Sequence, residues 1–304
     1  MSRRQFIAAL GGIAGSVLLA ACARPAGNPA PSAPRAGATP APAALPAFPR
    51  DSYMRTIQDR GALRAGTNYD AQLFGFLNPG TGQPEGFDVD ICRLIAKGLF
   101  GDPDRVEFLN VTTAIRMAFV EQNLGDVVAA TMTITKKRAE EVDFSDVYYE
   151  SAQMILVPKG SPIADIQDTA NRRVCAAKGS TSIDNLRQLQ PLAIPDAPVG
   201  WVDCLHDVQQ KKADAISTDD TILMGLAAEA KAQNFPMVLL NKRLSYEPYG
   251  VAIKKGRAGF VPFVNQVLAN AKQNGEWAKV FQRWLGEYLP TPPPPTKTAT
   301  EAAV

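Results

Sequence analysis

Apolar runs of strand length alternate with amphipathic segments along most of the chain. The apolar runs predict strands over residues 63–67, 106–109, 126–130, 173–177 and 213–217. Apolar residues at three- and four-residue spacing predict helices over residues 89–99, 114–122, 135–142, 182–189, 204–212, 221–233, 262–274 and 276–288. Strands that alternate with helices favour an α/β fold built on mostly parallel sheets.

One of these helices has a clear apolar stripe. Val89, Cys92, Ile95 and Leu99 recur at three- and four-residue spacing, so they share one face of a helix. Asp88 comes directly before the stripe, and an Asp side chain can accept hydrogen bonds from the first N–H groups of a helix. We therefore expect Asp88 to cap this helix.

The first 21 residues are typical of an export signal. Ser2-Arg3-Arg4-Gln5-Phe6-Ile7 resembles the twin-arginine motif, and the apolar stretch over residues 7–21 is too short for a comfortable membrane span. Leu19-Ala20-Ala21-Cys22 resembles a bacterial lipobox, in which the cysteine is acylated before cleavage. We expect a signal peptide over residues 1–21 and a lipid anchor on Cys22. An ordinary signal peptide with an incidental cysteine is the alternative.

Both ends of the mature chain lack apolar bulk. Residues 22–50 are rich in Pro, Ala and Gly, and residues 290–304 begin with a proline run. Such segments cannot bury enough surface to order themselves. We expect a disordered linker over residues 22–50, a disordered tail over residues 290–304 and a folded body over residues 51–289.

Composition and charge narrow the function classes. The chain has 304 residues, 46% of them hydrophobic and 20% charged, which is globular and long enough for one large domain or two ordinary ones. Five of the basic residues lie within residues 1–50, which hold no acidic residue, so residues 51–304 carry a net charge of −3. A nucleic-acid partner is therefore not expected. His206 is the one histidine, and the sequence has no metal-ligand cluster, phosphate-binding loop or G-x-S-x-G motif, so we expect no metal and no cofactor.

Polar residues follow the strand predicted over residues 126–130. Thr131 and Thr133 offer hydroxyl and N–H groups at the strand end, and Arg138 lies in the first turn of the next helix. A helix dipole disfavours a cation there, whereas a planar guanidinium suits a carboxylate held at two points. The alternative is a surface Arg138 paired with an acidic neighbour at residues 140–143.

Two later strand ends carry complementary groups. Residues 178–182 (Lys-Gly-Ser-Thr-Ser) open a helix and let backbone N–H groups approach an anion, although Ser and Thr are also ordinary helix caps. Asp219 and Asp220 follow the strand over residues 213–217 and can accept an ammonium group, although one of them is expected to cap the next helix. Ligands of α/β sheets bind beyond the carboxyl ends of the strands. The three strand ends together predict a site for a zwitterion, such as an α-amino acid.

Several longer motifs resemble those of the polar amino-acid-binding proteins of bacterial ABC importers. They run in order from Leu63 to Gly286 and comprise Gly86-Phe87-Asp88-Val89-Asp90-Ile91, residues 133–145, Tyr148-Tyr149, residues 178–182, Ala213-Asp214-Ala215, Glu247-Pro248-Tyr249-Gly250 and Trp284-Leu285-Gly286. The resemblance implies the two-lobe periplasmic-binding-protein fold (type II), in which two α/β lobes joined by two hinge strands close on the ligand. It places lobe 1 at residues 51–156 and 252–289 and lobe 2 at residues 157–251, with crossings near Val157-Pro158 and Tyr249-Gly250-Val251.

The resemblance also assigns roles to the residues at the strand ends. It implies that Arg138 holds the ligand α-carboxylate with help from Thr133 and Thr181. Ser180, in the same helix start as Thr181, is also expected to bind the ligand. Asp219 matches the acceptor of the α-ammonium group. Thr131 falls where a backbone or hydroxyl group meets that ammonium, and Tyr69 falls in the segment that supplies an aromatic wall.

Two departures favour a subgroup. The segment over residues 68–76 is unlike the histidine or lysine binders and is similar to the proteins that take glutamate, glutamine, aspartate or asparagine. Arg116 falls where that subgroup often has an arginine that reaches the cleft. We expect Arg116 to meet an acidic or amide side chain of the ligand, and a solvated Arg116 on a helix face is the alternative.

The cysteines serve more than one purpose. Cys175 lies in a lobe 2 strand and Cys204 lies before a lobe 2 helix. Export to an oxidising compartment makes a disulfide between them plausible, and the resemblance implies cysteines at this pair of positions. Cys92 lies on an apolar stripe and is expected to be a buried small hydrophobe.

The resulting hypothesis is a binding protein and not an enzyme. The chain would be exported, anchored outside the cytoplasmic membrane through Cys22 alone, monomeric, and able to deliver an amino acid to a separate permease. Two alternatives use the same fold. One is an enzyme similar to the cyclohexadienyl dehydratases, and the other is a sensor that signals to a separate receptor.

Overall fold

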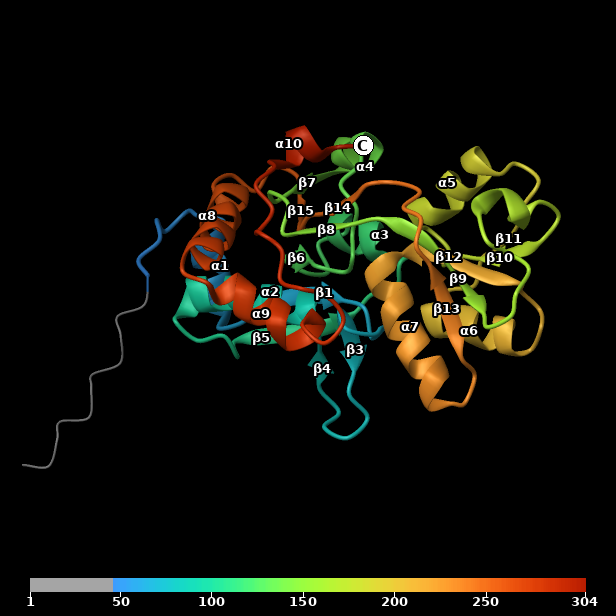
Figure 1. Ribbon diagram of the computed structural model, residues 1–304. Helices are drawn as coiled ribbons and strands as arrows, with labels where there is room; N and C mark the ends of the chain where they lie inside the picture. Colours follow the sequence, from blue (N-terminus) through green and yellow to red (C-terminus); the bar gives the residue numbers. More distant parts are fainter. Residues whose placement is uncertain (1–45) are drawn as a thin grey trace, which may run out of the picture. The chain divides into compact units, whose positions relative to one another are not determined.

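The computed structural model describes residues 46–304 (Figure 1). The predicted signal peptide, the lipid site Cys22 and most of the predicted linker lie outside these residues. Within the described part of the chain, no helix is long and apolar enough to cross a membrane.

The first lobe is built on a five-stranded sheet in the order β5-β1-β6-β15-β7. Its strands are β1 (Leu63–Thr67), β5 (Val106–Asn110), β6 (Val127–Val128), β7 (Val142–Phe144) and β15 (Ala252–Lys254). The strands β5, β1 and β6 run parallel, and β15 is antiparallel to both of its neighbours. Figure 1 shows α1 (Tyr53–Arg60), α2 (Phe87–Phe100), α8 (Phe260–Gln273) and α9 (Glu276–Leu285) gathered in this lobe with the sheet. The smaller helices of this lobe are α3 (Arg116–Glu121) and α4 (Lys136–Glu141).

Both faces of this sheet are buried. Val127 packs with α2, α8 and α9 in one apolar cluster, whereas its neighbour Val128 packs with Phe119 of α3 in another. Successive residues of a strand point to opposite faces. An apolar run without alternation is therefore what a two-sided sheet needs, and the strand prediction rested on such runs.

The second lobe has its own five-stranded sheet, in the order β11-β10-β12-β9-β13. Its strands are β9 (Gln153–Pro158), β10 (Arg173–Cys175), β11 (Ile194–Asp196), β12 (Ala215–Asp219) and β13 (Met237–Leu240). The sheet is flanked by α5 (Thr181–Leu189), α6 (Trp201–Gln209), α7 (Asp220–Ala232) and the 3₁₀ helix η1 (Ile166–Thr169). Ile216 faces α6 and α7, and Ala215 faces the cluster that contains Leu186 of α5.

The chain crosses between the lobes at a two-stranded antiparallel sheet made of β8 (Tyr149–Ser151) and β14 (Glu247–Tyr249). The strand β9 starts at Gln153 and already pairs with β12 of the second lobe. The boundary predicted at residues 156 and 157 is therefore wrong, because it falls inside β9. The apolar run over residues 152–157 looks continuous in sequence, and only its pairing shows to which sheet it belongs. A third small sheet joins β2 (Asp70–Ala71), β3 (Gly75–Leu77) and β4 (Pro84–Glu85).

Asp88 does not cap the helix that follows it. The helix α2 begins at Phe87 with Gly86 as its N-cap, and Asp88 is fully buried within the first turn. A Cβ on Gly86 would lie 2.2 Å from the Phe74 carbonyl oxygen, so the cap position is closed to any other residue. Asp88 is thereby free for a tertiary role, described below.

Both ends that were predicted to be disordered are ordered where the structure describes them. Phe48, within the predicted linker, packs edge-on against Phe263 at 5.3 Å between ring centroids. The tail over residues 290–304 forms the helix α10 (Ala299–Ala302), and Ala302 is only 2% exposed. For residues 46–50 and 290–304 the disorder prediction was wrong, because composition measures what a segment can bury by itself, whereas these residues are ordered by the lobe they pack on.

A disulfide joins Cys175 of β10 to Cys204 of α6, as predicted. It lies inside the second apolar core and ties a strand to the helix that covers it. Cys92 is a free thiol and is fully buried.

We expect the double substitution Cys175→Ala and Cys204→Ala to lower the free energy of unfolding by about 3 kcal/mol. The cause is the loss of a cross-link between residues 29 positions apart, which restricts the unfolded chain. Equilibrium unfolding in denaturant measures the change. A reductant should lower the stability of the wild type and leave the double variant unchanged. Free thiols are counted after residues 46–304 are unfolded without reductant. A count above one would contradict the cross-link.

Candidate functional site

The carboxyl ends of strands from both lobes meet at the interlobe boundary. Gly179, which follows β10, approaches Ala114 so closely that a Cβ there would lie 3.0 Å from the Ala114 Cα. Gly179 also has φ +83°, a backbone conformation that glycine adopts without strain. A second interlobe contact is the hydrogen bond that the Trp201 N–H donates to Asp70 at 2.8 Å. The lobes are therefore in direct contact around the strand ends.

Arg138 bridges the two lobes. Its backbone N–H donates to the Thr135 hydroxyl, the side-chain cap of α4, at 3.1 Å. Its guanidinium donates through Nη1 to the Thr133 carbonyl at 2.8 Å and through Nη2 to the Gly179 carbonyl at 3.2 Å. This second bond reaches lobe 2, so Arg138 is not the solvated surface residue of the alternative reading.

A buried carboxylate joins Thr133 to Thr181. The Thr133 and Thr181 hydroxyls both donate to Glu247 Oε2, at 2.6 and 2.9 Å. The other oxygen, Oε1, accepts from Asn185 at 2.9 Å and from Ser245 at 2.5 Å. Glu247 is 1% exposed and lies in the hinge strand β14. Glu247 belongs to a motif of the sequence, but nothing in that motif indicates where its side chain points, so this role does not follow from the sequence.

Arg116 is buried and lies at the end of lobe 1. It is 3% exposed, and its Nη1 donates to the carbonyl oxygens of Ala130 and Thr131, the latter at 3.1 Å. Its Nε has no hydrogen-bond partner among residues 46–304. Burial lowers the pKa of Arg116 to about 9, with a smaller contribution from the nearby Arg138, and Asp219 acts in the opposite direction. A solvated arginine on a helix face, the alternative reading, is therefore wrong.

Asp88 holds Thr131 in an uncommon backbone conformation. Thr131 has φ +45°, and its N–H donates to Asp88 Oδ2 at 2.7 Å. The Tyr148 hydroxyl donates to the other Asp88 oxygen at 2.6 Å. Burial raises the pKa of Asp88 to about 7, against the opposing effects of these two hydrogen bonds and of Arg116. Asp88 is thus a positioning residue for Thr131 and not the predicted helix cap.

Asp219 is the acidic member of the site. It is 4% exposed, and its Oδ2 accepts a hydrogen bond from the Tyr249 hydroxyl. Its Oδ1 has no partner within the described part of the chain. Burial and the repulsion of Glu247 and then Asp220 raise the pKa of Asp219 well above its usual range, while Tyr249 and Arg116 oppose the shift. A cation beside Oδ1 would favour the ionised form. The neighbouring Asp220 is engaged by its own helix, because its carboxylate accepts the Thr221 N–H at 2.8 Å.

Three further polar residues lie at the strand ends: Ser180 and Tyr69, which were predicted to bind the ligand, and Asn68, which was not. Ser180 is buried, and its hydroxyl has no partner among the described residues. Tyr69 follows β1, and its hydroxyl donates to the Phe108 carbonyl of β5 at 3.3 Å. Asn68, which was not singled out from the sequence, is fully buried, and its amide donates to the Val111 carbonyl at 2.9 Å while its Oδ1 is unpartnered within residues 46–304.

The arrangement suits a small molecule that carries both charges. Asp219 lies close enough to act on the charges of both Arg116 and Arg138, and one of its oxygens has no partner among the described residues. A cleft of about 1060 Å³ is lined by Arg138, Ser180, Thr181 and Glu247. Buried polar atoms without partners cost free energy, and a ligand that pairs with them recovers it.

One group of side chains in the described residues has the spacing of a metal site. One ligand atom each of Cys175, Asp196 and Asp207 lie within 4.8 Å of one another. The Cys175 sulfur is part of the disulfide, so it cannot serve as the thiolate that a metal binds.

Comparison with known proteins places the chain among solute receptors. Residues 63–287 match the family of bacterial extracellular solute-binding proteins, family 3. The ABC transporter glutamine-binding protein GlnH of Bacillus subtilis is 37% identical over 77% of this chain and 85% of its own length. The glutamate-binding protein GluB of Corynebacterium glutamicum is 26% identical over 78% of this chain and 82% of its own length.

Solved structures have the same fold. The solute receptor for L-cysteine of Neisseria gonorrhoeae superposes with a TM-score of 0.72 at 28% identity, covering 78% of this chain and 96% of that chain. The ancestral amino acid-binding protein AncCDT-1, described as a precursor of cyclohexadienyl dehydratase, superposes with a TM-score of 0.68 at 31% identity, covering 77% and 99%. These likenesses confirm the two-lobe α/β fold (type II) that the resemblance implied.

The substitution Asp88→Asn should change how stability depends on pH. The folded-state pKa of Asp88, about 7, lies above the value of about 4 for an unfolded Asp, so the folded state binds the proton more tightly. The Asp88 contribution is present below pH 4 and is lost as the pH rises from about 4 to about 7. Over this window the free energy of unfolding of the wild type should fall relative to that of Asp88→Asn, which keeps an oxygen for the Thr131 N–H.

Denaturant unfolding from pH 4 to pH 8 measures this difference. Asp102→Asn, at an exposed position of lobe 1, is the matched control and should run parallel to the wild type. Parallel profiles of the wild type and Asp88→Asn would show that Asp88 does not titrate in this range.

Proposed function

Because the chain belongs to the bacterial extracellular solute-binding proteins, family 3, we propose that it captures a polar L-amino acid outside the cytoplasmic membrane and delivers it to an ABC transporter. The observation that carries this proposal is the position of Arg138, whose guanidinium donates to Thr133 of lobe 1 and to Gly179 of lobe 2, with the charge of Asp219 near enough to act on it. The guanidinium binds the ligand α-carboxylate, and the free oxygen of Asp219 accepts a hydrogen bond from the α-ammonium group. A ligand that contacts both lobes favours the closed arrangement, since a ligand shifts an equilibrium by its differential affinity for the two states.

The ligand side chain meets Arg116 and Asn68. Arg116 begins α3 and donates to the Thr131 carbonyl, which lies beyond the end of β6, and Asn68 directly follows the neighbouring strand β1. The free Nε of Arg116 can donate to a carbonyl or carboxylate oxygen, and the free Oδ1 of Asn68 can accept from an amide. This pair suits the glutamate, glutamine, aspartate and asparagine class and favours the amide members. The printed names of GlnH and GluB, a glutamine- and a glutamate-binding protein, support this class.

The attachment of the protein also belongs to the proposal. The lipobox-like Leu19-Ala20-Ala21-Cys22 supports acylation of Cys22, and the Arg3-Arg4 pair supports export by the twin-arginine route. One copy of the chain carries every group of the site, which supports a monomer. The membrane contact is then through the lipid alone.

A thermal-shift panel of the twenty amino acids tests the function. Residues 23–304 are unfolded and refolded beforehand to remove carried-over ligand. An amino acid at about 100 times its dissociation constant adds roughly 2.7 kcal/mol of stability, so one or two acidic or amide amino acids should raise the unfolding midpoint selectively. In Arg138→Ala the same amino acids should give no shift, because the α-carboxylate would be buried without its partner.

Two outcomes of the panel would count against the proposal. Silence of the folded wild type across all twenty amino acids would discard the amino-acid ligand. Turnover of prephenate or arogenate by the same preparation would favour the dehydratase reading.

A second test concerns selectivity. Arg116→Met keeps the length of the side chain and removes the donors, so affinity for the preferred ligand should fall roughly 10- to 100-fold, as expected for a hydrogen bond from a charged group. Affinity for alanine, measured by calorimetry beside it, should change little. Arg93→Met, which removes a guanidinium paired with Asp90 outside the site, is the control. An unchanged ranking of ligands in Arg116→Met would refute the role of Arg116.

A further inference from the structure

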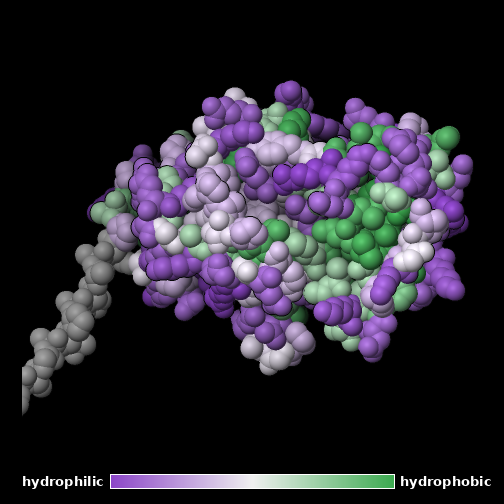
Figure 2. Space-filling view, in the orientation of Figure 1, coloured by the Kyte–Doolittle hydropathy of each residue, from purple (hydrophilic) through white to green (hydrophobic). Residues whose placement is uncertain are grey.

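The segment over residues 290–304 lies beyond the part of the chain that matches the family, which ends at residue 287. It is nevertheless ordered and follows a defined path. Figure 1 shows it leaving α9, passing the crossing strands and ending beside α4. Figure 2 shows polar residues over most of this face, with apolar residues gathered mainly in the half that holds lobe 2.

The proline run forms one wall of a cavity of about 500 Å³ at the crossing between the lobes. Its prolines face residues of lobe 1, of lobe 2 and of the crossing strand β8. The lining includes Pro290, Pro292, Pro293 and Pro295 from the segment, Trp277 and Phe281 from lobe 1, Met224 and Leu239 from lobe 2, and Tyr149 from β8. A proline run is stiff and loses little conformational entropy when it docks.

The middle of the segment is held by directed contacts. The Val147 N–H donates to the Lys297 carbonyl at 3.1 Å, just before β8. The Lys297 ammonium lies 4.1 Å from the centre of the Tyr246 ring, just before β14. The segment therefore contacts the chain beside both crossing strands.

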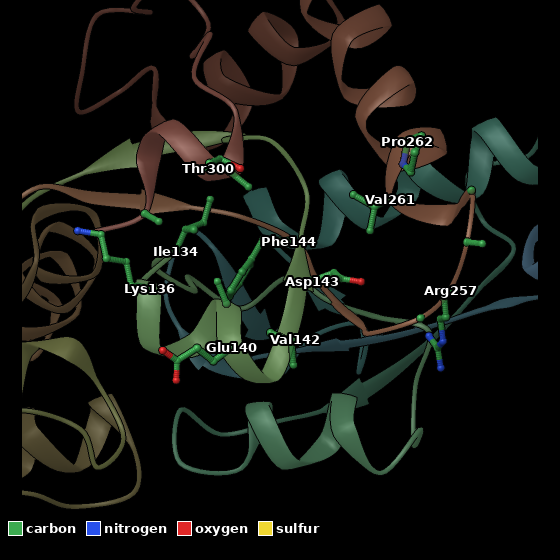
Figure 3. Close-up of a pocket in the computed structure, with 16 residues that line it drawn as sticks. Ile134, Lys136, Glu140, Val142, Asp143, Phe144, Arg257, Val261, Pro262 and Thr300 are labelled. Carbon is green, nitrogen blue, oxygen red and sulfur yellow. The ribbon is translucent and has the colours of Figure 1, made fainter.

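The helix α10 packs on lobe 1 through alanines, of which Ala302 is the buried one and Ala299 and Ala303 are partly buried. Ala302 belongs to the apolar cluster of Val128, Phe119 and Phe144, whereas its neighbour Thr300 is exposed. A cavity of about 840 Å³ lies between α10, α4 and the start of α8, and Figure 3 shows Thr300 and Ile134 on its α10 side.

The end of the segment pairs with the strand end that carries the ligand site. The Val304 N–H donates to the Ile134 carbonyl at 3.3 Å, and the Lys136 N–H donates to the Val304 main-chain oxygen at 3.0 Å. These two bonds flank Thr135, whose hydroxyl caps the helix that carries Arg138. Val304 lines the same cleft as Arg138.

The helix α4 needs such support. It has only six residues, and helices this short are unstable by themselves. The N–H groups of its first turn have no partners within the helix. The Arg138 N–H donates to the Thr135 hydroxyl, and the Lys136 N–H donates to the Val304 main-chain oxygen.

We propose that residues 290–304 form a positioning strap for the ligand site, which docks through Ala302 and holds the start of α4, and with it Arg138, through Val304. The strap raises the affinity for the amino acid by holding Arg138 in place before the ligand arrives. This inference rests on the proposed function, since its readout is amino-acid binding.

The first experiment compares two substitutions in residues 23–304. Ala302→Asp places a charge in the apolar cluster and should undock α10, whereas Thr300→Asp adds the same charge to the same helix at an exposed position. Titration calorimetry with the preferred amino acid should show affinity about 3- to 10-fold weaker for Ala302→Asp, the effect of one hydrogen bond, and unchanged for Thr300→Asp. Ala302→Ser, which keeps a small side chain, should restore most of the loss.

The second experiment separates positioning from general stability. A chain that ends at Leu289 is titrated with the amino acid in the presence and absence of a synthetic peptide of residues 290–304. The wild-type peptide should recover the affinity, and a peptide carrying Ala302→Asp should not. Unfolding midpoints and near-ultraviolet circular dichroism show whether the truncated chain is folded.

The outcomes are distinct. If folded Ala302→Asp binds the amino acid as tightly as the wild type does, the strap is overturned and the proposed function stands. The strap is also overturned if Thr300→Asp loses as much affinity as Ala302→Asp, since the effect would then come from charge alone. A wild type that binds no amino acid overturns both proposals.

Discussion

Four side-chain donors converge on the buried carboxylate of Glu247, and the arrangement of the two lobes depends on this convergence. Thr133 comes from lobe 1, whereas Thr181 and Asn185 come from lobe 2, and Glu247 itself lies in a hinge strand. A carboxylate that is 1% exposed is costly unless its oxygens are satisfied, and here each oxygen accepts two hydrogen bonds. If the lobes separated, Glu247 would lose the hydrogen bond from Thr133. Water could replace that bond only after the lobes had moved apart.

The groups around Glu247 include two arginines and the acidic Asp219. A zwitterion carries a charge opposite to each of them. Burial lowers the pKa of both Arg116 and Arg138, and the charge of Arg138 lowers that of Arg116 further. Asp219 is pushed in the opposite direction, toward the neutral acid, by burial and by Glu247. A ligand that brings a carboxylate to the arginines and an ammonium group to Asp219 relieves both penalties at once. In the proposed function such a ligand would contact both lobes, which would couple binding to closure through these groups.

The backbone around Arg138 and Thr131 is held from behind. Asp88 fixes Thr131 at φ +45°, and Val304 together with Thr135 supports the first turn of α4. Neither Asp88 nor Val304 belongs to the strand end that it supports. The precision of the site therefore comes from residues distant in the chain, which is the usual way that a binding constellation is kept in place before its ligand arrives.

The sequence by itself determined the alternation of strands and helices, because burial periodicity is written in consecutive residues. Its long ordered motifs carried the resemblance that implied the two-lobe fold and the cysteines at positions 175 and 204. The tertiary structure alone decided that Asp88 supports Thr131 instead of capping α2, that the apolar run after residue 152 belongs to the second lobe, and that residues 290–304 are ordered. In each case the deciding partner lies far away in the chain: Thr131 for Asp88, β12 for β9, and Ile134 and Lys136 for Val304. Side-chain direction and strand pairing are set by what the folded chain brings alongside, and no local window of sequence contains that partner.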